Sequence, residues 1–154
     1  MIYFLVLHSF YKNGECRIIM FTSCRLTLTQ VNMPDGSAVV DCAAGELHSA
    51  AVTNNGYLYT WGSAENGCLG HGSQAASGQQ PNPTRVESKS LGGKLCMRVG
   101  CGMNHTGVIT TDGDLYTFGA GWYGRLGLRE SDNVYEPQRV LVHETGPHIR
   151  FQKV

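Results

Sequence analysis

The stretch TNNGYLYTWGSAENGCLG at residues 53–70 returns 57 residues later as TTDGDLYTFGAGWYGRLG at residues 110–127. When the two copies are extended without gaps to residues 45–72 and 102–129, 11 of the 28 aligned columns are identical. An internal repeat of this length decides the architecture before any single motif does. The identical pairs are Gly45/Gly102, His48/His105, Thr53/Thr110, Gly56/Gly113, Leu58/Leu115, Tyr59/Tyr116, Thr60/Thr117, Gly62/Gly119, Gly67/Gly124, Leu69/Leu126 and Gly70/Gly127.

The match continues beyond these two phrases. NPTRV at residues 82–86 aligns with EPQRV at residues 136–140, and KLCMRV at 94–99 aligns with IRFQKV at 149–154. The first copy carries three extra residues within SQAASGQQ, a small and polar segment that is typical of a tolerated surface insertion. Each copy therefore predicts one structural unit with a variable loop.

Within each unit the sequence predicts short strands. The Asn-Gly and Asp-Gly pairs of TNNG and TTDG predict hairpins closed by type I′ turns, which need positive φ at both central residues. In LYTWG and LYTFG, Leu and Thr are expected to face opposite to Tyr. Pro83 and Pro137 are predicted to open a third strand, and residues 96–101 to form a fourth. No amphipathic helix is predicted in these units.

A repeat of four strands and this length is typical of a β-propeller blade. We therefore predict an all-β fold of four-stranded antiparallel blades, forming a partial propeller. Residues 1–38 are assigned to an N-terminal segment, either the remnant of a preceding blade or disordered. Residues 39–98 are the first complete repeat, and residues 99–154 are a second repeat that ends at the start of a third.

Charge and composition exclude several functions. The 154 residues contain 12 basic and 12 acidic side chains, so the balance disfavours bulk electrostatic binding to nucleic acid or to an anionic membrane. The apolar run at residues 2–7 lacks a basic n-region and is too short to span a bilayer, so it predicts a buried strand or a tail rather than secretion. A cytoplasmic or nuclear location is expected.

The six cysteines form no C-x-x-C pair and match neither a zinc site nor a compact secreted disulfide framework. They are interpreted as buried or half-buried free thiols in a reducing compartment. A disulfide or redox switch is the alternative. No metal site and no cofactor are predicted.

The phrases AAGELHSAAVTNNGYLYTWGSAENGCLGHG and GCGMNHTGVITTDGDLYTFGAGWYGRLGL resemble the repeat of the regulator of chromosome condensation family. That repeat runs as a glycine, a histidine with Ser or Thr, a hairpin, an aromatic-glycine pair and a terminal Leu-Gly. The resemblance covers residues 39–154. It implies a seven-bladed propeller of about 400 residues, of which this chain carries two complete repeats.

The resemblance also suggests functions. Some relatives are exchange factors for a small nuclear GTPase that bind chromatin, and others are ultraviolet-B photoreceptors with a G-W-x-H-T phrase. Glu46 and Met103 stand at the tryptophan positions of that phrase, so a chromophore site is not expected. Our leading hypothesis is a non-catalytic module that binds a protein partner. The alternative is part of a guanine-nucleotide exchange factor for a small GTPase, with chromatin association.

Two sets of residues are candidates for a role. His48 and His105 recur in the same column, which indicates structural histidines that hydrogen-bond inside or between blades rather than ligands or bases. No catalytic residue is predicted. The residues that the copies do not share are candidate protein contacts, and their alternative is packing on an adjacent blade: Glu46, Met103, Trp122, Tyr123 and Arg125. Exposed blade faces are also expected to favour self-association.

Overall fold

The computed structural model describes residues 4–12, 15–22, 25–73, 78–87, 89–141 and 151. The described chain is built of β-strands and short 3-10 turns, with no α-helix, which confirms the all-β prediction. None of its described helical segments has the length and apolarity needed to cross a bilayer. The strands are β1 (Phe4–Lys12), β2 (Glu15–Thr22), β3 (Arg25–Gln30), β4 (Val39–Ala44), β5 (His48–Thr53), β6 (Leu58–Ser63), β7 (Gln79–Arg85), β8 (Cys96–Cys101), β9 (His105–Thr110), β10 (Leu115–Gly119) and β11 (Val134–Arg139), and the turns used below are η1 (Glu65–Gly67) and η4 (Trp122–Gly124).

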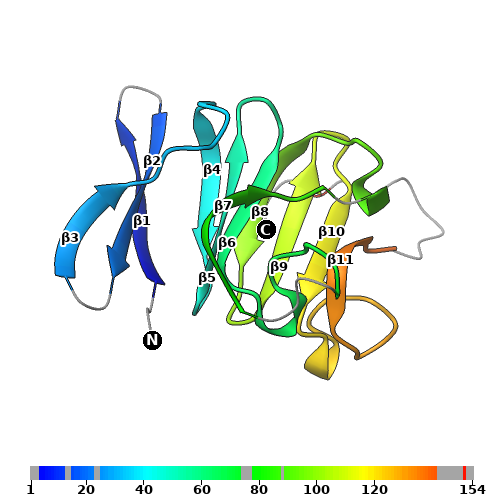
Figure 1. Ribbon diagram of the computed structural model, residues 1–154. Helices are drawn as coiled ribbons and strands as arrows, with labels where there is room; N and C mark the ends of the chain where they lie inside the picture. The colour runs from blue at the N-terminus through cyan, green and yellow to red at the C-terminus, as the bar shows by residue number, and fades with distance from the viewer. Residues whose placement is uncertain are drawn as a thin grey trace.

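Two antiparallel sheets lie side by side (Figure 1). One runs in the order β1-β2-β4-β5-β6-β7, with β3 paired to β2, and the other in the order β11-β10-β9-β8. The four strands β4 to β7 and the four strands β8 to β11 are the two blades of a partial propeller. Strand β2 joins the first blade through the single pair of Cys16 with Val39. The strand predicted at residues 2–7 is present as β1 from Phe4 onward, and its predicted burial lies outside what the structure describes.

Strand β8 corrects one assignment made from the sequence. Residues 96–101 were expected to complete the first unit, but β8 pairs with β9 and begins the second blade. The strand that begins the first blade is β4, which pairs with β5 in the same way. Four strands, β4 to β7, already complete the first blade, and β7 at its edge contains Pro83, which has no N–H to donate to a further strand.

The two prolines lie within their strands rather than at the start. Pro83 is inside β7 and Pro137 is inside β11. Both strands are outermost in their blades, so a missing N–H breaks no essential ladder bond. Proline also blocks the pairing of further strands at these edges.

The hairpins lie where the sequence predicted them, but their turn type differs from the prediction. The N–H of Gly56 donates to the carbonyl of Thr53 at 2.8 Å, and Thr53 pairs with Tyr57 rather than with Gly56. Gly56 has a φ of 75°, but neither asparagine of the turn has positive φ, so the type I′ prediction is wrong. The loop is the three-residue type that closes on a left-handed glycine. The hydroxyl of Thr53 adds to this register by accepting from the N–H of Tyr57 at 3.3 Å.

The main core lies between the two blades. Leu58 of the first blade packs there with Tyr116 and Phe118 of the second. Tyr59 and Trp61 face the other way and pack with Met33 and other residues that precede or flank the first blade, which confirms the predicted alternation of Leu against Tyr. The leucine face of the first blade thus lies against the aromatic face of the second. The members of the main core are Ala50, Val52, Leu58, Val86, Leu91, Cys96, Val99, Val108, Tyr116 and Phe118.

We predict that Phe118→Ala lowers the free energy of unfolding by about 3–5 kcal/mol, because the fully buried ring leaves a cavity between the blades. Urea unfolding followed by circular dichroism measures the change. Leu141→Ala is the control, since Leu141 is 68% exposed and its loss is expected to cost roughly 0.5 kcal/mol or less. Equal stability of the two variants would contradict an interblade core at this position.

Candidate interaction surface at the loop end of the blades

The antiparallel order of each blade brings two loops to the same end. In the first blade the β4–β5 loop and the β6–β7 loop lie there, and in the second blade the β8–β9 and β10–β11 loops do. We call this the loop end, formed by residues 45–47, 64–73, 102–104 and 120–133. All five predicted contact residues lie on it, although they come from three separate loops.

Two of the predicted contact residues are directly joined. The N–H of Glu46 donates to the carbonyl of Met103 at 3.3 Å, so the β4–β5 and β8–β9 loops touch across the blades. The N–H of Ala120 donates to the carbonyl of Asn104 at 2.8 Å, which holds the β10–β11 loop beside them. Met103 remains 58% exposed, so its side chain faces solvent.

The repeated histidine joins the two blades. Nε2 of His48 lies 2.9 Å from the Thr106 hydroxyl, and that hydroxyl donates to the carbonyl of Cys68 at 2.8 Å. Because the hydroxyl proton is already used, Nε2 of His48 carries a proton and donates it. His48 is therefore a structural histidine between blades, as predicted. Its partner is the hydroxyl of the other copy, not that of neighbouring Ser49.

The repeated glycine three residues earlier makes room for this ring. A Cβ placed on Gly45 would overlap the imidazole of His48, and one on Gly102 would overlap that of His105. The pattern Gly-x-x-His therefore requires glycine at its first position, because the histidine ring lies against the backbone there.

Both imidazoles are held in the neutral form. Burial, with a smaller contribution from His105, lowers the pKa of His48 to about 4. Burial also lowers the pKa of His105, and the nearby charge of Arg125 adds to the effect. Nδ1 of each ring is buried without a hydrogen-bond partner among the described residues. Neither ring has the paired acid or base expected of a catalytic histidine.

The turns η1 and η4 have the same backbone but different surroundings. Their central residues, Asn66 and Tyr123, have φ of 59° and 61°. In η1, Asn66 accepts a hydrogen bond from the Asn133 amide at 3.2 Å. In η4 the corresponding Tyr123 is 95% exposed, and Trp122 beside it is 48% exposed. The second blade covers the first turn, while no described residue covers the second in that way.

Arg125 is stacked on the exposed aromatic side chains. Its guanidinium carbon lies 5.7 Å from the centre of the Trp122 ring and 5.9 Å from that of Tyr123, within the range of cation–π attraction. Its Nε–H donates to the carbonyl of Trp122 at 2.9 Å. The ion pairs of the described residues do not include Arg125. We call residues 122–125 the WYGR turn.

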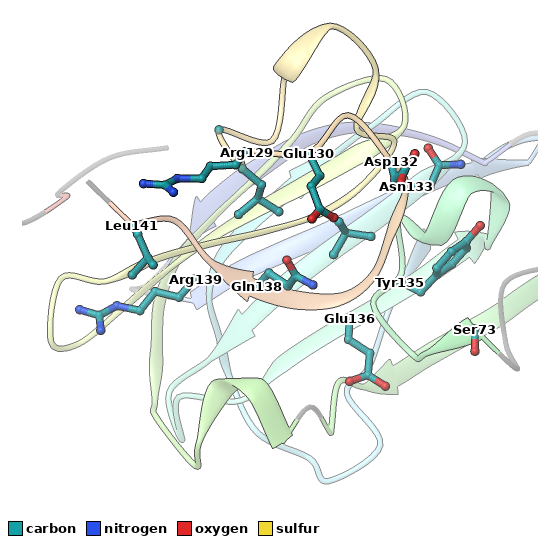
Figure 2. Close-up of a pocket in the computed structure, with 13 residues that line it drawn as sticks. Ser73, Arg129, Glu130, Asp132, Asn133, Tyr135, Glu136, Gln138, Arg139 and Leu141 are labelled. Atoms are coloured by element: carbon teal, nitrogen blue, oxygen red, sulfur yellow. The ribbon is translucent and has the colours of Figure 1, made fainter. Parts of the chain in front are cut away.

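A groove of about 630 Å³ lies along β11 and the loop that precedes it (Figure 2). Its charged residues are of both signs, and Arg139 among them is paired with Asp114 at 2.6 Å. Figure 2 shows Arg129 and Glu130 on one side and Glu136 on another, without convergence on a point. The described residues contain no group of three or more side chains placed to hold a metal ion.

Three of the described cysteines are free thiols, as predicted for them: Cys68, Cys96 and Cys101. Burial raises the pKa of Cys68 and Cys101 to about 12 and that of Cys96 to about 11. A thiol with so high a pKa is a poor nucleophile, because the thiolate is the reactive form. The side chains of Cys16 and Cys24 lie outside the described ones.

Two residues that cover η1 were missed from the sequence. Asn133 and Tyr135 lie against η1 and cover it. Nothing in the repeat marks them, because they lie in the loop and strand start where the two copies differ in length.

Comparison with known proteins gives one consistent result. The model of the regulator of chromosome condensation (RCC1) repeat matches residues 55–109 and 112–154, and a second model of that repeat matches residues 39–68. The chain is 39% identical over 97 residues to the E3 ubiquitin-protein ligase HERC2 of Homo sapiens, and equally to that of Mus musculus. This match covers 63% of the chain and 2% of HERC2.

Solved propellers have a similar fold. Yeast RCC1 (Prp20), solved bound to Kap60, superposes with a TM-score of 0.67 at 22% identity, over 77% of this chain and 28% of that one. Human WBSCR16 superposes with a TM-score of 0.69 at 20% identity, over 89% of this chain and 40% of that one. The chain thus spans less than half of either structure.

We predict that stability falls as the pH drops from 6.5 towards 4. An unfolded histidine binds its proton near 6.5, but His48 in the fold binds it only near 4, so acid favours the unfolded chain. The loss from His48 alone amounts to at most about 3 kcal/mol, and stability from this group is fully present above pH 6.5. Thermal melts across this pH range measure the slope.

The control for this slope is His48→Asn. The variant is expected to be less stable than the native chain at pH 7, but its stability is expected to fall less on acidification. A residual slope is expected, because the pKa of His71 and of His105 is also lowered by burial. An unchanged slope in the variant would show that His48 does not carry the effect.

We predict that Tyr123→Asn raises the melting temperature or leaves it unchanged. Asparagine tolerates positive φ better than tyrosine does, and the first copy has Asn66 at the same backbone angles. Tyr123 is exposed, so little burial is lost. Differential scanning calorimetry of the native chain and the variant measures the two melting temperatures. A clear destabilisation would mean that Tyr123 has a structural role.

Proposed function

The chain belongs to the regulator of chromosome condensation (RCC1) repeat family, and we propose that it is a non-catalytic protein-interaction module whose loop end contacts a protein partner. The proposal includes the five residues that differ between the repeats as contact residues. A cytoplasmic or nuclear location and self-association through blade faces are proposed with it.

The observation that supports this proposal most is the exposure of apolar side chains at the loop end. Five large hydrophobic side chains are exposed in the described part of the chain, and three of them lie on the loop end: Met103, Trp122 and Tyr123. Exposed aromatic and arginine side chains that are close together are the residues that contribute most to protein interfaces. The repeat itself does not require them, because the first copy has other residues at these positions.

The alternative is a role in guanine-nucleotide exchange. Prp20p of Saccharomyces cerevisiae is a relative by fold, and its structure was solved together with a study of its binding to Gsp1p and histones. Release of labelled GDP from a small GTPase, with and without the chain, tests this alternative. An acceleration at catalytic amounts of the chain would support exchange over simple binding.

We predict that exchanging Trp122→Glu and Tyr123→Asn together abolishes partner binding without loss of stability. These are the residues of the first repeat at the same turn, so the backbone is expected to be kept. Quantitative crosslinking and mass spectrometry compares the amounts of each protein captured by the native chain and by the double variant. Losing two interface anchors is expected to reduce capture about 30-fold or more.

The matched control is Leu141→Ala, which removes an exposed apolar side chain that is not on the loop end. It is expected to leave capture unchanged. If the double variant captures the same proteins as the native chain, the loop end is not the contact surface.

A further inference from the structure

We propose that the chain has a second binding surface at the end of the blades opposite to the loop end, where Arg85 binds a carboxylate of an acidic segment of a protein partner. The β5–β6 turn, the β9–β10 turn and the connection from β7 to β8 lie at this end. We call it the turn end, formed by residues 54–57, 85–87, 89–95 and 111–114. The inference goes beyond the proposed function, because none of its residues lies on the loop end.

A groove of about 390 Å³ opens at the turn end. Three buried side chains line it, Leu58, Leu91 and Cys96, and Leu95 beside them is 46% exposed. The volume is within the range of ligand-binding pockets. All of the lining residues lie in the first blade or between it and the start of β8, so the groove is not a face on which a further blade packs.

Two arginines hold the same place in the two blades. Arg85 of NPTRV and Arg139 of EPQRV occupy one column of the repeat. Arg85 pairs with Tyr59 in the β6–β7 ladder. Arg139 pairs with Tyr116, the equivalent tyrosine, in the β10–β11 ladder. Differences between the contacts of the two arginines therefore come from the residues around them and not from their position in the strand.

The second blade shows what this arginine binds. Nη2 of Arg139 donates to the carboxylate of Asp114 at 2.6 Å. Lys94, which also lines the groove, donates to the same carboxylate. The first blade has Tyr57 in the column of Asp114, so Arg85 meets an aromatic ring where Arg139 meets a carboxylate. A carboxylate of a partner would supply the group that the first blade lacks at this place.

The ring of Tyr57 fixes Arg85 in position. The guanidinium carbon of Arg85 lies 3.5 Å from the centre of the Tyr57 ring, a close cation–π contact. Such a contact uses the face of the guanidinium, whereas its N–H donors point outward in its own plane. The ion pairs of the described residues do not include Arg85, which is exposed. A guanidinium that is already oriented binds a carboxylate by two parallel hydrogen bonds at little entropic cost.

The other charges of the groove favour an anion. Lys89 is exposed, and the described ion pairs do not include it. Lys94 is paired with Asp112 and Asp114, so its charge is already balanced. Among the described lining residues, Glu87 is the one acidic side chain. Two cations outside ion pairs thus stand against one carboxylate.

The apolar part of the groove favours a protein segment as the ligand. A Cβ placed on Gly56 would lie 2.7 Å from the Cβ of Leu95, so this side chain rests on the β5–β6 turn and is held there. An aliphatic side chain next to the acidic residue would cover Leu91 and Leu95 and exclude water from the ion pair.

A nucleic acid fits this surface less well. Binding of a phosphate backbone needs a row of cations, and the chain as a whole has no net charge. Glu87 and Glu136 line a neighbouring hollow together with Arg85, and their carboxylates would repel a polyanion. A single carboxylate on Arg85 is compatible with them.

The test uses the full chain and three pools of immobilised ten-residue peptides, random except for a central Asp-Leu, Asn-Leu or Lys-Leu. We expect retention in the order Asp, Asn, Lys. The advantage of Asp over Lys is expected to be at least about tenfold and to shrink at high salt, because it comes from an ion pair at a partly exposed site.

Two variants remove the site in different ways. Arg85→Gln removes the guanidinium and is expected to retain the Asp and Asn pools equally. Tyr57→Asp gives the first blade the carboxylate that the second blade has in Asp114, so Arg85 is expected to pair within the chain and the preference for Asp is again lost. Circular dichroism melts of both variants establish that they fold.

Two further variants are controls of opposite kinds. Arg139→Gln removes the equivalent arginine, which is already paired with Asp114, and should keep the preference for Asp. Glu87→Gln removes the one carboxylate that lines the groove and should raise retention of the Asp pool roughly two- to fivefold. The double variant of the WYGR turn, Trp122→Glu with Tyr123→Asn, should leave the preference unchanged, so this result and the crosslinking result for the loop end are independent.

Three outcomes would overturn the inference. Equal retention of the three pools, or retention of none, would exclude an acidic segment as the ligand. A preference for Asp that persists in Arg85→Gln would place the ligand elsewhere on the chain. Tighter binding of a labelled single-stranded oligonucleotide than of any peptide, lost in Arg85→Gln, would assign the groove to nucleic acid.

Discussion

The imidazole of His48 connects the two blades at the end where their loops meet. It donates to Thr106, which donates to the carbonyl of Cys68, so one ring links three segments of the chain. The link requires a neutral ring with one proton on Nε2, and it requires Gly45 beneath the ring. The contact of Glu46 with Met103 and the position of η1 both depend on this alignment of the blades.

The repeat predicted the fold because the shared residues that form the strands and turns have the same structural task in both copies. The threonine of each LYT phrase shows this, since Thr60 donates to the carbonyl of Leu69 and Thr117 to that of Leu126. Strand membership was harder. The sequence does not show which neighbour β8 pairs with, because a repeat gives the order of the strands but not the point at which one blade ends and the next begins.

The candidate surface was predictable only in part. Alternating strand directions place the β8–β9 and β10–β11 loops at one end, so the location of Met103 and Trp122 at the same end follows from the antiparallel order. The stacking of Arg125 and the exposure of Tyr123 do not follow from it. Both depend on whether another segment covers the turn, and that is decided by residues such as Asn133, which lie far along the chain from the turn they cover.

The contact between His48 and Thr106 gives the repeat a direction. Ser49 occupies the column of Thr106, and its buried hydroxyl has no partner among the described residues. His105 occupies the column of His48 and, among those residues, has no matching hydroxyl. Of these two residues, Ser49 is buried and only His105 is half-exposed. The contact could therefore be repeated only on the His105 flank, by a strand that presents a hydroxyl there as Thr106 does to His48.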